Sequence, residues 1–233
     1  MENKYKILSG SALKLIACLS MLADHLAKFY LPRFPWAKVV WLSVMGKSIS
    51  LLQLLIMFGR FAFPLFVFLL VVGFEHTRSR KRYGLSLFVL ALLSEIPFNL
   101  MTGRGLFCPT HNVMFTLLIG FLAMCSLDYF RQKPIFALLS IVILYLVSRY
   151  MQADYRTSGF IFILLMYGLR KERIIRCVTV PIILPMKLLT FLSVILTFFY
   201  NGKRGFIKTP FLKYCFYAFY PVHMLLIYFL ARQ

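Results

Sequence analysis

Acidic residues are the scarcest chemical class in this chain, with 7 aspartates and glutamates against 27 lysines and arginines in 233 residues. In a soluble protein the resulting net charge of +20 would indicate nucleic acid as a partner. Here the basic residues gather in short breaks between long apolar runs, and 61% of all residues are hydrophobic. We therefore assign the charge to membrane orientation and anionic lipid headgroups, and expect no nucleic acid partner.

Paired cysteines and internal repeats are also missing. The five cysteines are scattered without a Cys-X-X-Cys pair, so the sequence predicts neither a disulfide framework nor a metal site. No polar linker and no repeated halves of the transporter type interrupt the chain. We therefore predict a single domain over residues 1–233.

Apolar runs recur from residue 11 to the C-terminus with only short polar breaks, which is typical of a polytopic membrane protein. We predict an all-α transmembrane bundle of about eight spans, with nine or ten as alternatives. Between the first two spans, residues 32–50 carry Trp36 and Trp41 beside lysines. This composition is typical of a segment at the membrane interface, with an extra short span as the alternative. The candidate spans are 11–31, 51–74, 85–101, 113–129, 134–150, 157–169, 175–200 and 213–231.

The distribution of basic residues predicts the orientation. RSRKR at 78–82 and RKER at 170–173 are the strongest basic clusters, whereas the breaks at 102–112 and 150–156 are far less basic. The positive-inside rule then places both clusters and the N-terminus on the cytoplasmic side of a bacterial inner membrane.

One loop disagrees with this orientation. By the same count of spans, NGKRGFIK at 201–208 would face outward despite its basic residues. Either Pro181 and Pro185 break the seventh segment into a re-entrant or double element, or this loop has an external task.

Several ionisable residues lie inside the apolar runs, where a charge costs about 3 kcal/mol and is usually kept for a site or pathway. Lys14 and His25 are eleven residues apart, which is three helical turns and places both on one face about 16 Å apart. Asp24 adjoins His25, but consecutive helix residues point about 100° apart, so an ion pair with Lys28 is the alternative to a dyad.

Further polar residues fall at predicted helix ends. Arg60 and Glu95 should lie at similar depth on antiparallel spans and form our first candidate ion pair. Glu75, His76 and the RSRKR cluster would form a basic rim suited to phosphates, unless they serve orientation alone. On the outer side, His111 and Asn112 open the fourth span, and Asp154 and Tyr155 open the sixth, where helix caps are the plainer explanation. His223 in the last span is consistent with an interhelical hydrogen bond.

Seven ordered segments resemble the TraX family from residue 13 to about 225. They are LKLIACLSMLADH, GRFAFPLFVFLLVVGFEHTR, LLSEIPFNL, HNVMFTLLIG, ADYR, YNGKRG and FYPVH. That family includes the F-pilin acetylase and resembles the multi-span acyltransferase type 3 group, whose motif places a basic residue ahead of a histidine as Lys14 precedes His25. The chain has Arg156 where the family pattern leads us to expect glycine or another small residue after the tyrosine.

The resemblance implies an integral membrane acetyltransferase that moves an acetyl group from acetyl-CoA to an amine or hydroxyl at the cell envelope, on a pilin N-terminus or a glycan. His25 would be the general base or acetyl carrier, with Asp24 beside it. The CoA phosphates would be held by Lys14, Arg78, Arg80, Lys81 and Arg82. The acceptor would be held by Arg60, Glu95, His111, Asn112, Asp154 and Tyr155.

Two other classes of protein remain open at this point. A transporter or channel would also carry intramembrane Asp, Glu, His and Arg, although repeated halves are lacking. A structural or assembly protein would leave the charges at bilayer depth unexplained.

Overall fold

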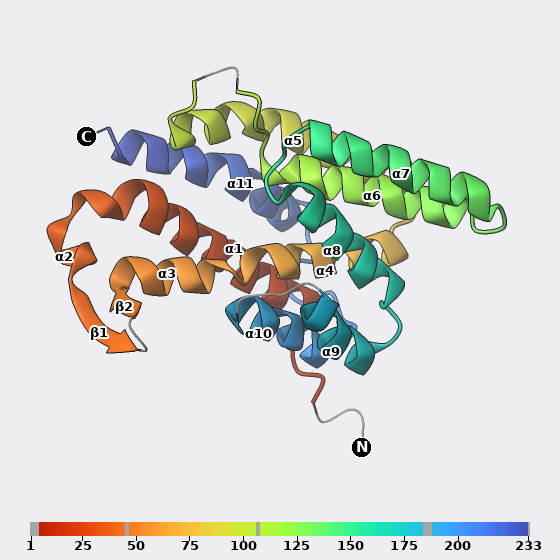
Figure 1. The fold of residues 1–233 in the computed structure, drawn as a ribbon, viewed down its shortest axis with the longest axis horizontal. Helices are drawn as coiled ribbons and strands as arrows, with labels where there is room; N and C mark the ends of the chain where they lie inside the picture. Colours follow the sequence, from red (N-terminus) through yellow and green to blue (C-terminus); the bar gives the residue numbers. More distant parts are fainter. Residues whose placement is uncertain (1–4, 45–46, 106–107, 184–187, 233) are drawn as a thin grey trace. The chain divides into compact units, whose positions relative to one another are not determined.

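The computed structural model describes residues 5–44, 47–105, 108–183 and 188–232, and this part of the chain is helical apart from one short hairpin (Figure 1). The predicted all-α class is confirmed. Backbone contacts divide the chain into two compact units, each described by itself below, and the single domain over 1–233 stays a prediction. Unit 1 comprises Met1–Phe66, Leu100–Gly103 and Pro185–Gln233, and unit 2 comprises Val67–Asn99 and Arg104–Leu184.

Unit 1 begins with α1 (Gly10–His25), which Ser9 caps by accepting a hydrogen bond from the Ala12 amide. A π-helical turn (Leu26–Tyr30) and a 3-10 turn (Leu31–Arg33) continue it. α1 itself has 16 residues and is about 24 Å long at 1.5 Å per residue, and the two turns lengthen the segment. The π-helical turn starts directly after His25, and such turns often mark functional sites.

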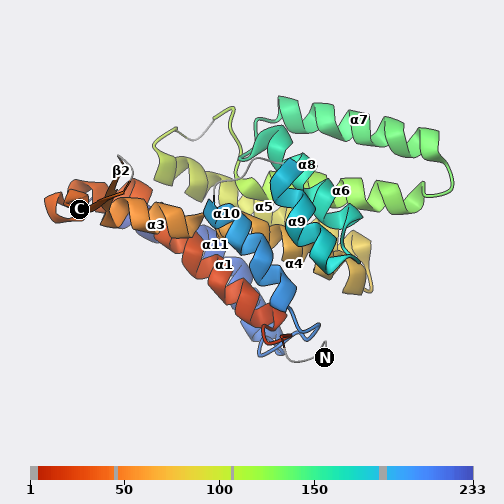
Figure 2. The same ribbon diagram turned by 60° about the horizontal axis from the view of Figure 1, so that its bottom comes forward.

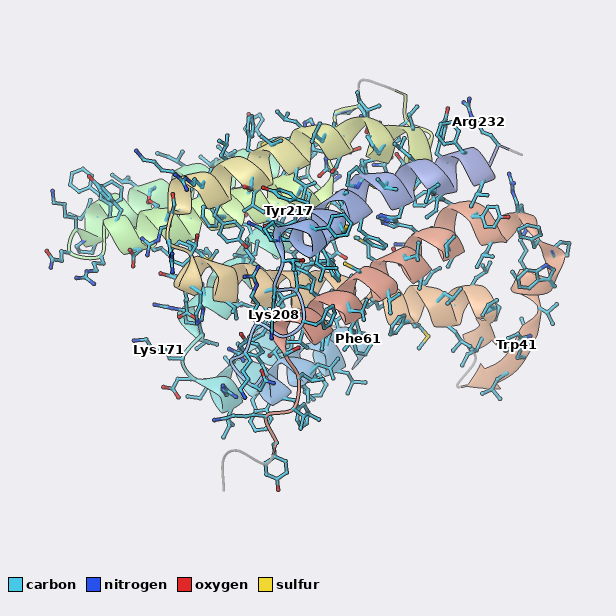
Figure 3. The ribbon with its side chains drawn as sticks, turned by 180° about the vertical axis from the view of Figure 1, so that it is seen from behind. Trp41, Phe61, Lys171, Lys208, Tyr217 and Arg232 are labelled. Atoms are coloured by element: carbon cyan, nitrogen blue, oxygen red, sulfur yellow. The ribbon has the colours of Figure 1, made fainter. Side chains whose placement is uncertain are left out.

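The segment after α1 is too short to span a membrane. It forms α2 (Pro35–Lys38) and an antiparallel hairpin of β1 (Val40–Val44) and β2 (Lys47–Ser50). A five-residue strand is about 17 Å long. Trp36 and Trp41 are 55% and 62% exposed, and Figure 3 labels Trp41 on the hairpin. The alternative of an extra span is therefore wrong, and the interfacial interpretation is favoured.

A long apolar helix follows the hairpin with one interruption. α3 (Leu51–Gly59) starts at a capping box between Ser50 and Gln53, and α4 (Ala62–His76) follows after a turn at Arg60 and Phe61. Together, Leu51–His76 is long and apolar enough to cross a membrane. Within unit 1, α3 packs on α1, where the Ser20 hydroxyl donates to the Phe58 carbonyl at 2.7 Å.

The last third of the chain contributes α10 (Leu188–Leu196), a 3-10 turn (Thr197–Phe199) and α11 (Pro210–Leu230) to unit 1. The loop before α11 is hydrogen-bonded to the start of α1: the Gly10 and Ser11 amides donate to the Lys203 and Arg204 carbonyls at 2.9 and 2.8 Å. At the other end, Arg33 donates to the Leu230 carbonyl at 2.8 Å. Therefore α1 and α11 run in parallel, as the path of α1 from the N-terminus in Figure 2 illustrates.

This arrangement corrects the expectation for the loop 201–208. Its backbone pairs with residues 8–11, so it lies on the same side as the segment that precedes α1. The predicted seventh span over 175–200 covers most of α9 (Arg173–Ile183), all of α10 and the 3-10 turn, and the junction of α9 with α10 lies outside the described residues. Pro181 lies inside α9 and lacks an amide hydrogen, while Pro185 lies outside the described residues.

We expect cysteines placed at Ile7 and Lys203 to react alike with a membrane-impermeant maleimide, in a chain that lacks the native cysteines. Both should be protected in intact cells and labelled after permeabilisation, because the two positions are joined through the Leu8 and Asn201 backbone at 2.9 Å. A chain that retains only native Cys108, in a break predicted to lie outside, serves as the comparison. Labelling at 203 with protection at 7 would contradict the pairing.

Unit 2 contains α5 (Arg80–Thr102) up to Asn99, α6 (Val113–Tyr129), α7 (Pro134–Tyr150), α8 (Arg156–Gly168) and α9. In Figure 1, α6 and α7 form an antiparallel hairpin, and α8 packs on both. The core beneath them is formed by Ile119, Ala123 and Phe160. Among the described residues, α5 is the second helix that is long and apolar enough to span a membrane. The higher count of about eight spans stays a prediction.

Candidate functional site

The two histidines of unit 1 contact each other between α1 and α11. His25 Nδ1 lies 2.8 Å from His223 Nε2, and the rings are stacked with centroids 5.0 Å apart and an interplanar angle of 7°. His223 Nδ1 lies 2.7 Å from the Phe219 carbonyl oxygen. A carbonyl only accepts, so His223 Nδ1 carries a hydrogen and its Nε2 accepts from His25 Nδ1. This chain of hydrogen bonds leaves the lone pair of neutral His25 on Nε2.

The surroundings fix both rings. His223 is buried, and Phe219 stacks on it with centroids 4.9 Å apart. Phe29 meets the His25 ring edge-on at 6.1 Å. His25 itself is half-buried. Its hydrogen bond to buried His223 fixes the ring and therefore the direction in which Nε2 points. Such an imidazole can act as a general base or as a nucleophile.

Asp24 is engaged away from the imidazoles. Its carboxylate pairs with Lys28 at 2.5 Å, which is the alternative that the sequence left open. Asp24 also packs against Gly59 of α3, where an added Cβ would lie 2.4 Å from the Asp24 Cβ. The partner that orients His25 is His223. Sequence reasoning placed His223 in the last span without linking it to His25, and the signal available was a second histidine in an apolar helix.

Lys14 lies on α1 three turns before His25, as predicted. Its ammonium sits over two rings of α11, 5.8 Å from the Phe216 centroid and 5.5 Å from that of Tyr217, the residue labelled in Figure 3. Lys213 approaches the same tyrosine ring at 5.5 Å. These cation–π contacts hold the Lys14 charge against α11.

The predicted phosphate rim belongs to unit 2, and part of it is already paired. Arg80 Nη1 lies 2.5 Å from Asp128 Oδ2, and its guanidinium covers the Phe74 ring at 4.4 Å. Glu75 pairs with Arg170 at 3.1 Å. The other three predicted phosphate ligands of the cluster are exposed: Arg78, Lys81 and Arg82. A site that they share with Lys14 stays a prediction.

In unit 2, a second polar cluster joins α5 to the start of α6. Glu95 Oε1 accepts from His111 Nδ1 at 2.7 Å, and Oε2 accepts from the Asn112 side chain at 2.6 Å and its backbone amide at 3.2 Å. Asn112 caps α6 through the Met114 amide and also donates to the Ala91 carbonyl at 2.8 Å. The carboxylate thus sits at a helix N-terminus, which favours negative charge. Glu95 and His111 form a carboxylate–imidazole dyad.

The loop before α8 is attached to this cluster. The Asp154 amide donates to the His111 carbonyl at 3.0 Å, and the Thr116 hydroxyl donates to the Asp154 carbonyl. Tyr155 and Arg156 have positive φ angles of 66° and 42°. Non-glycine residues are strained in this region, by about 1 kcal/mol or more each. The expectation of glycine after the tyrosine therefore has a backbone reason, and Arg156 adopts the strained conformation.

Unit 2 thus brings together five of the six predicted acceptor residues: Glu95, His111, Asn112, Asp154 and Tyr155. Arg60 belongs to unit 1, so its ion pair with Glu95 stays a prediction.

Comparison with known proteins assigns the chain to a family. The family model described as TraX protein matches residues 9–231. The chain is 28% identical over 247 residues to a protein of Dichelobacter nodosus called probable fimbrial assembly protein FimC, serogroup H1, covering 94% of each. No solved structure matches. Because the family model covers nearly the whole sequence, the chain belongs to the TraX protein family.

Proposed function

We propose that this membrane protein is an acetyltransferase that moves an acetyl group from cytoplasmic acetyl-CoA to an amine or hydroxyl acceptor at the bacterial inner membrane. The observation that carries the proposal is the His25–His223 pair. Buried His223 accepts from His25 Nδ1, which leaves the lone pair of His25 on Nε2, where it can take a proton. The resemblance to acetylases and the membership of the TraX family support it.

The hydrogen-bond chain sets the roles in the reaction. His25 Nε2 removes the proton from the acceptor N–H or O–H while the freed electron pair attacks the acetyl carbonyl carbon. His223 Nε2 accepts from His25 Nδ1, so the positive charge that develops on His25 is stabilised. When the C–S bond breaks, protonated His25 returns its proton to the departing thiolate. If His25 is instead an acetyl carrier, the same Nε2 attacks the thioester first.

We propose that the polar cluster of unit 2 binds the acceptor. The Glu95–His111 dyad offers a carboxylate-oriented imidazole, and Asp154 adds a second acidic side chain on the attached loop. An amine acceptor arrives as an ammonium group, which acidic groups of this kind suit, and it releases one proton to water before the neutral amine enters the step above. The name of the Dichelobacter relative refers to fimbrial assembly, which favours a pilin N-terminus over an envelope glycan.

We expect purified protein in detergent or nanodiscs to transfer radiolabel from [acetyl-14C]acetyl-CoA to pilin from a strain that lacks the protein. Mass spectrometry should place one acetyl group on the acceptor, and the same assay with envelope glycan distinguishes the two acceptor classes. Pilin that already carries the acetyl group is the negative control. Binding of acetyl-CoA without transfer to either material would contradict the proposal and leave the transporter alternative ahead.

A further inference from the structure

Basic side chains from three segments of unit 1 converge near the ring of Tyr217. The ammonium groups of Lys14 and Lys213 each lie 5.5 Å from the centroid of this ring. Arg204, in the loop 201–208, lies beside the first turn of α1, because its carbonyl accepts from the Ser11 amide at 2.8 Å, one turn before Lys14. Lys14 and Lys213 are half-buried, so these like charges share a partly desolvated space.

No carboxylate in the described part of unit 1 balances this cluster. Among the described residues of unit 1, Asp24 is the sole acidic side chain, and Lys28 pairs with it at 2.5 Å. Converging cations in a partly dry environment repel one another unless an anion joins them. The described part of unit 1 offers no further acidic side chain for this role, so a bound anionic ligand would neutralise the cluster.

The loop that carries Arg204 has a fixed path. The Ser11 hydroxyl donates to the Arg204 carbonyl at 2.6 Å and accepts from the Ile207 amide at 2.9 Å. Gly205 has a φ of +87°, and a Cβ there would lie 2.3 Å from the Ser9 hydroxyl oxygen. Orientation in the membrane requires only that the loop be basic. The fixed path of this loop and the packing of Lys14 on aromatic rings are more than membrane orientation requires, and they indicate a further role for these cations.

We propose that Lys14, Arg204 and Lys213 form a site for a ligand that carries more than one phosphate group. Three cations on separate segments match the spread charge of a phosphorylated nucleotide, and guanidinium groups bind phosphate oxygens in a bidentate manner. The assignment of these phosphates to CoA rests on the proposed function, whereas the anion site itself does not. Lys14 thereby gains phosphate-binding partners in its own unit.

The probe for this site is 3′-phosphoadenosine 5′-diphosphate, which carries the phosphates of CoA but has no thioester. Titration of the purified full chain should show binding that weakens as salt rises. Arg204→Gln and Lys213→Gln should each weaken binding about tenfold, as expected for loss of a charge-assisted hydrogen bond. Arg204→Lys should retain part of the affinity, because it keeps the charge but loses the bidentate geometry. Lys38→Gln, an exposed charge in α2 of the same unit, is the matched control and should bind as the wild type does.

A lipid headgroup presents the same phosphate chemistry, and a second arm separates the two sources. Thermal stability is compared in nanodiscs of phosphatidylglycerol and of phosphatidylcholine. Stabilisation by phosphatidylglycerol that the two Gln variants lose, without nucleotide binding, would support the site with a lipid as its ligand. Equal responses of the Arg204, Lys213 and Lys38 variants to both probes would overturn it. A wild type that binds the nucleotide through these residues but transfers no acetyl group would contradict the proposed function alone.

Discussion

Replacing His25 by alanine should lower acetyl transfer by at least about a hundredfold, the loss expected when a general base is removed. Affinity for acetyl-CoA should persist, because Lys14 and the loop cations lie toward the other end of α1. The measurement is single-turnover transfer of radiolabel, with nucleotide binding as the check on folding. Unchanged transfer by His25→Ala protein would rule out both roles proposed for this residue.

The partner of His25 gives a sharper test of the hydrogen-bond chain. His223→Phe keeps a ring in the stack but removes the acceptor for His25 Nδ1–H, so kcat should fall by about 10- to 100-fold with little change in KM. His223→Gln, which retains an acceptor oxygen, should recover part of that loss. A purely structural role would affect both variants through stability.

Replacing Gly59 by alanine should destabilise the protein by about 1–3 kcal/mol, the usual range for overpacking a tight contact. The added Cβ would lie 2.4 Å from the Asp24 Cβ and 2.7 Å from its Oδ1, so α3 and α1 would have to separate. His25 adjoins Asp24, and transfer should therefore fall with stability. Thermal unfolding in detergent is the measurement.

The matched control for Gly59 is Gly168→Ala, because a Cβ at Gly168 meets no atom within 4 Å. Its unfolding temperature should be unchanged or slightly higher. The double variant Asp24→Gly with Gly59→Ala moves the Cβ from one helix to the other and should recover part of the stability. Additive losses in this double-mutant cycle would show that the two residues do not constrain each other.

Local signals predicted much of the fold. The bounds of α6 and α7 follow from sharp polar breaks, with Asn112 capping one helix and Pro134 starting the other. The same kind of signal placed Lys14 and His25 on one face of α1. Three-turn spacing is a property of a single helix, so no tertiary information was required.

The remaining features depend on contacts between distant segments. Nothing near residue 201 in the sequence shows that its loop returns to residues 8–11, so the sequence alone left the side of this loop open. Sequence reasoning weighed Asp24 as a partner for His25 and did not link His223 to it. The first is adjacent in sequence, but helix geometry turns it toward Lys28. The second lies 198 positions away and becomes a partner because α1 and α11 run in parallel.

The pairing of the first helix with the last has a consequence for biosynthesis. A ribosome adds about 5–20 residues per second, so His25 waits about 10–40 s before its partner emerges. During that interval the membrane holds a chain whose orientation is set but whose imidazole is unoriented. A chain that ends before α11 has no partner for His25 and cannot close the loop onto α1. If His25 acts as proposed, catalytic competence is the last property the nascent chain acquires, and we expect products truncated before α11 to be inactive.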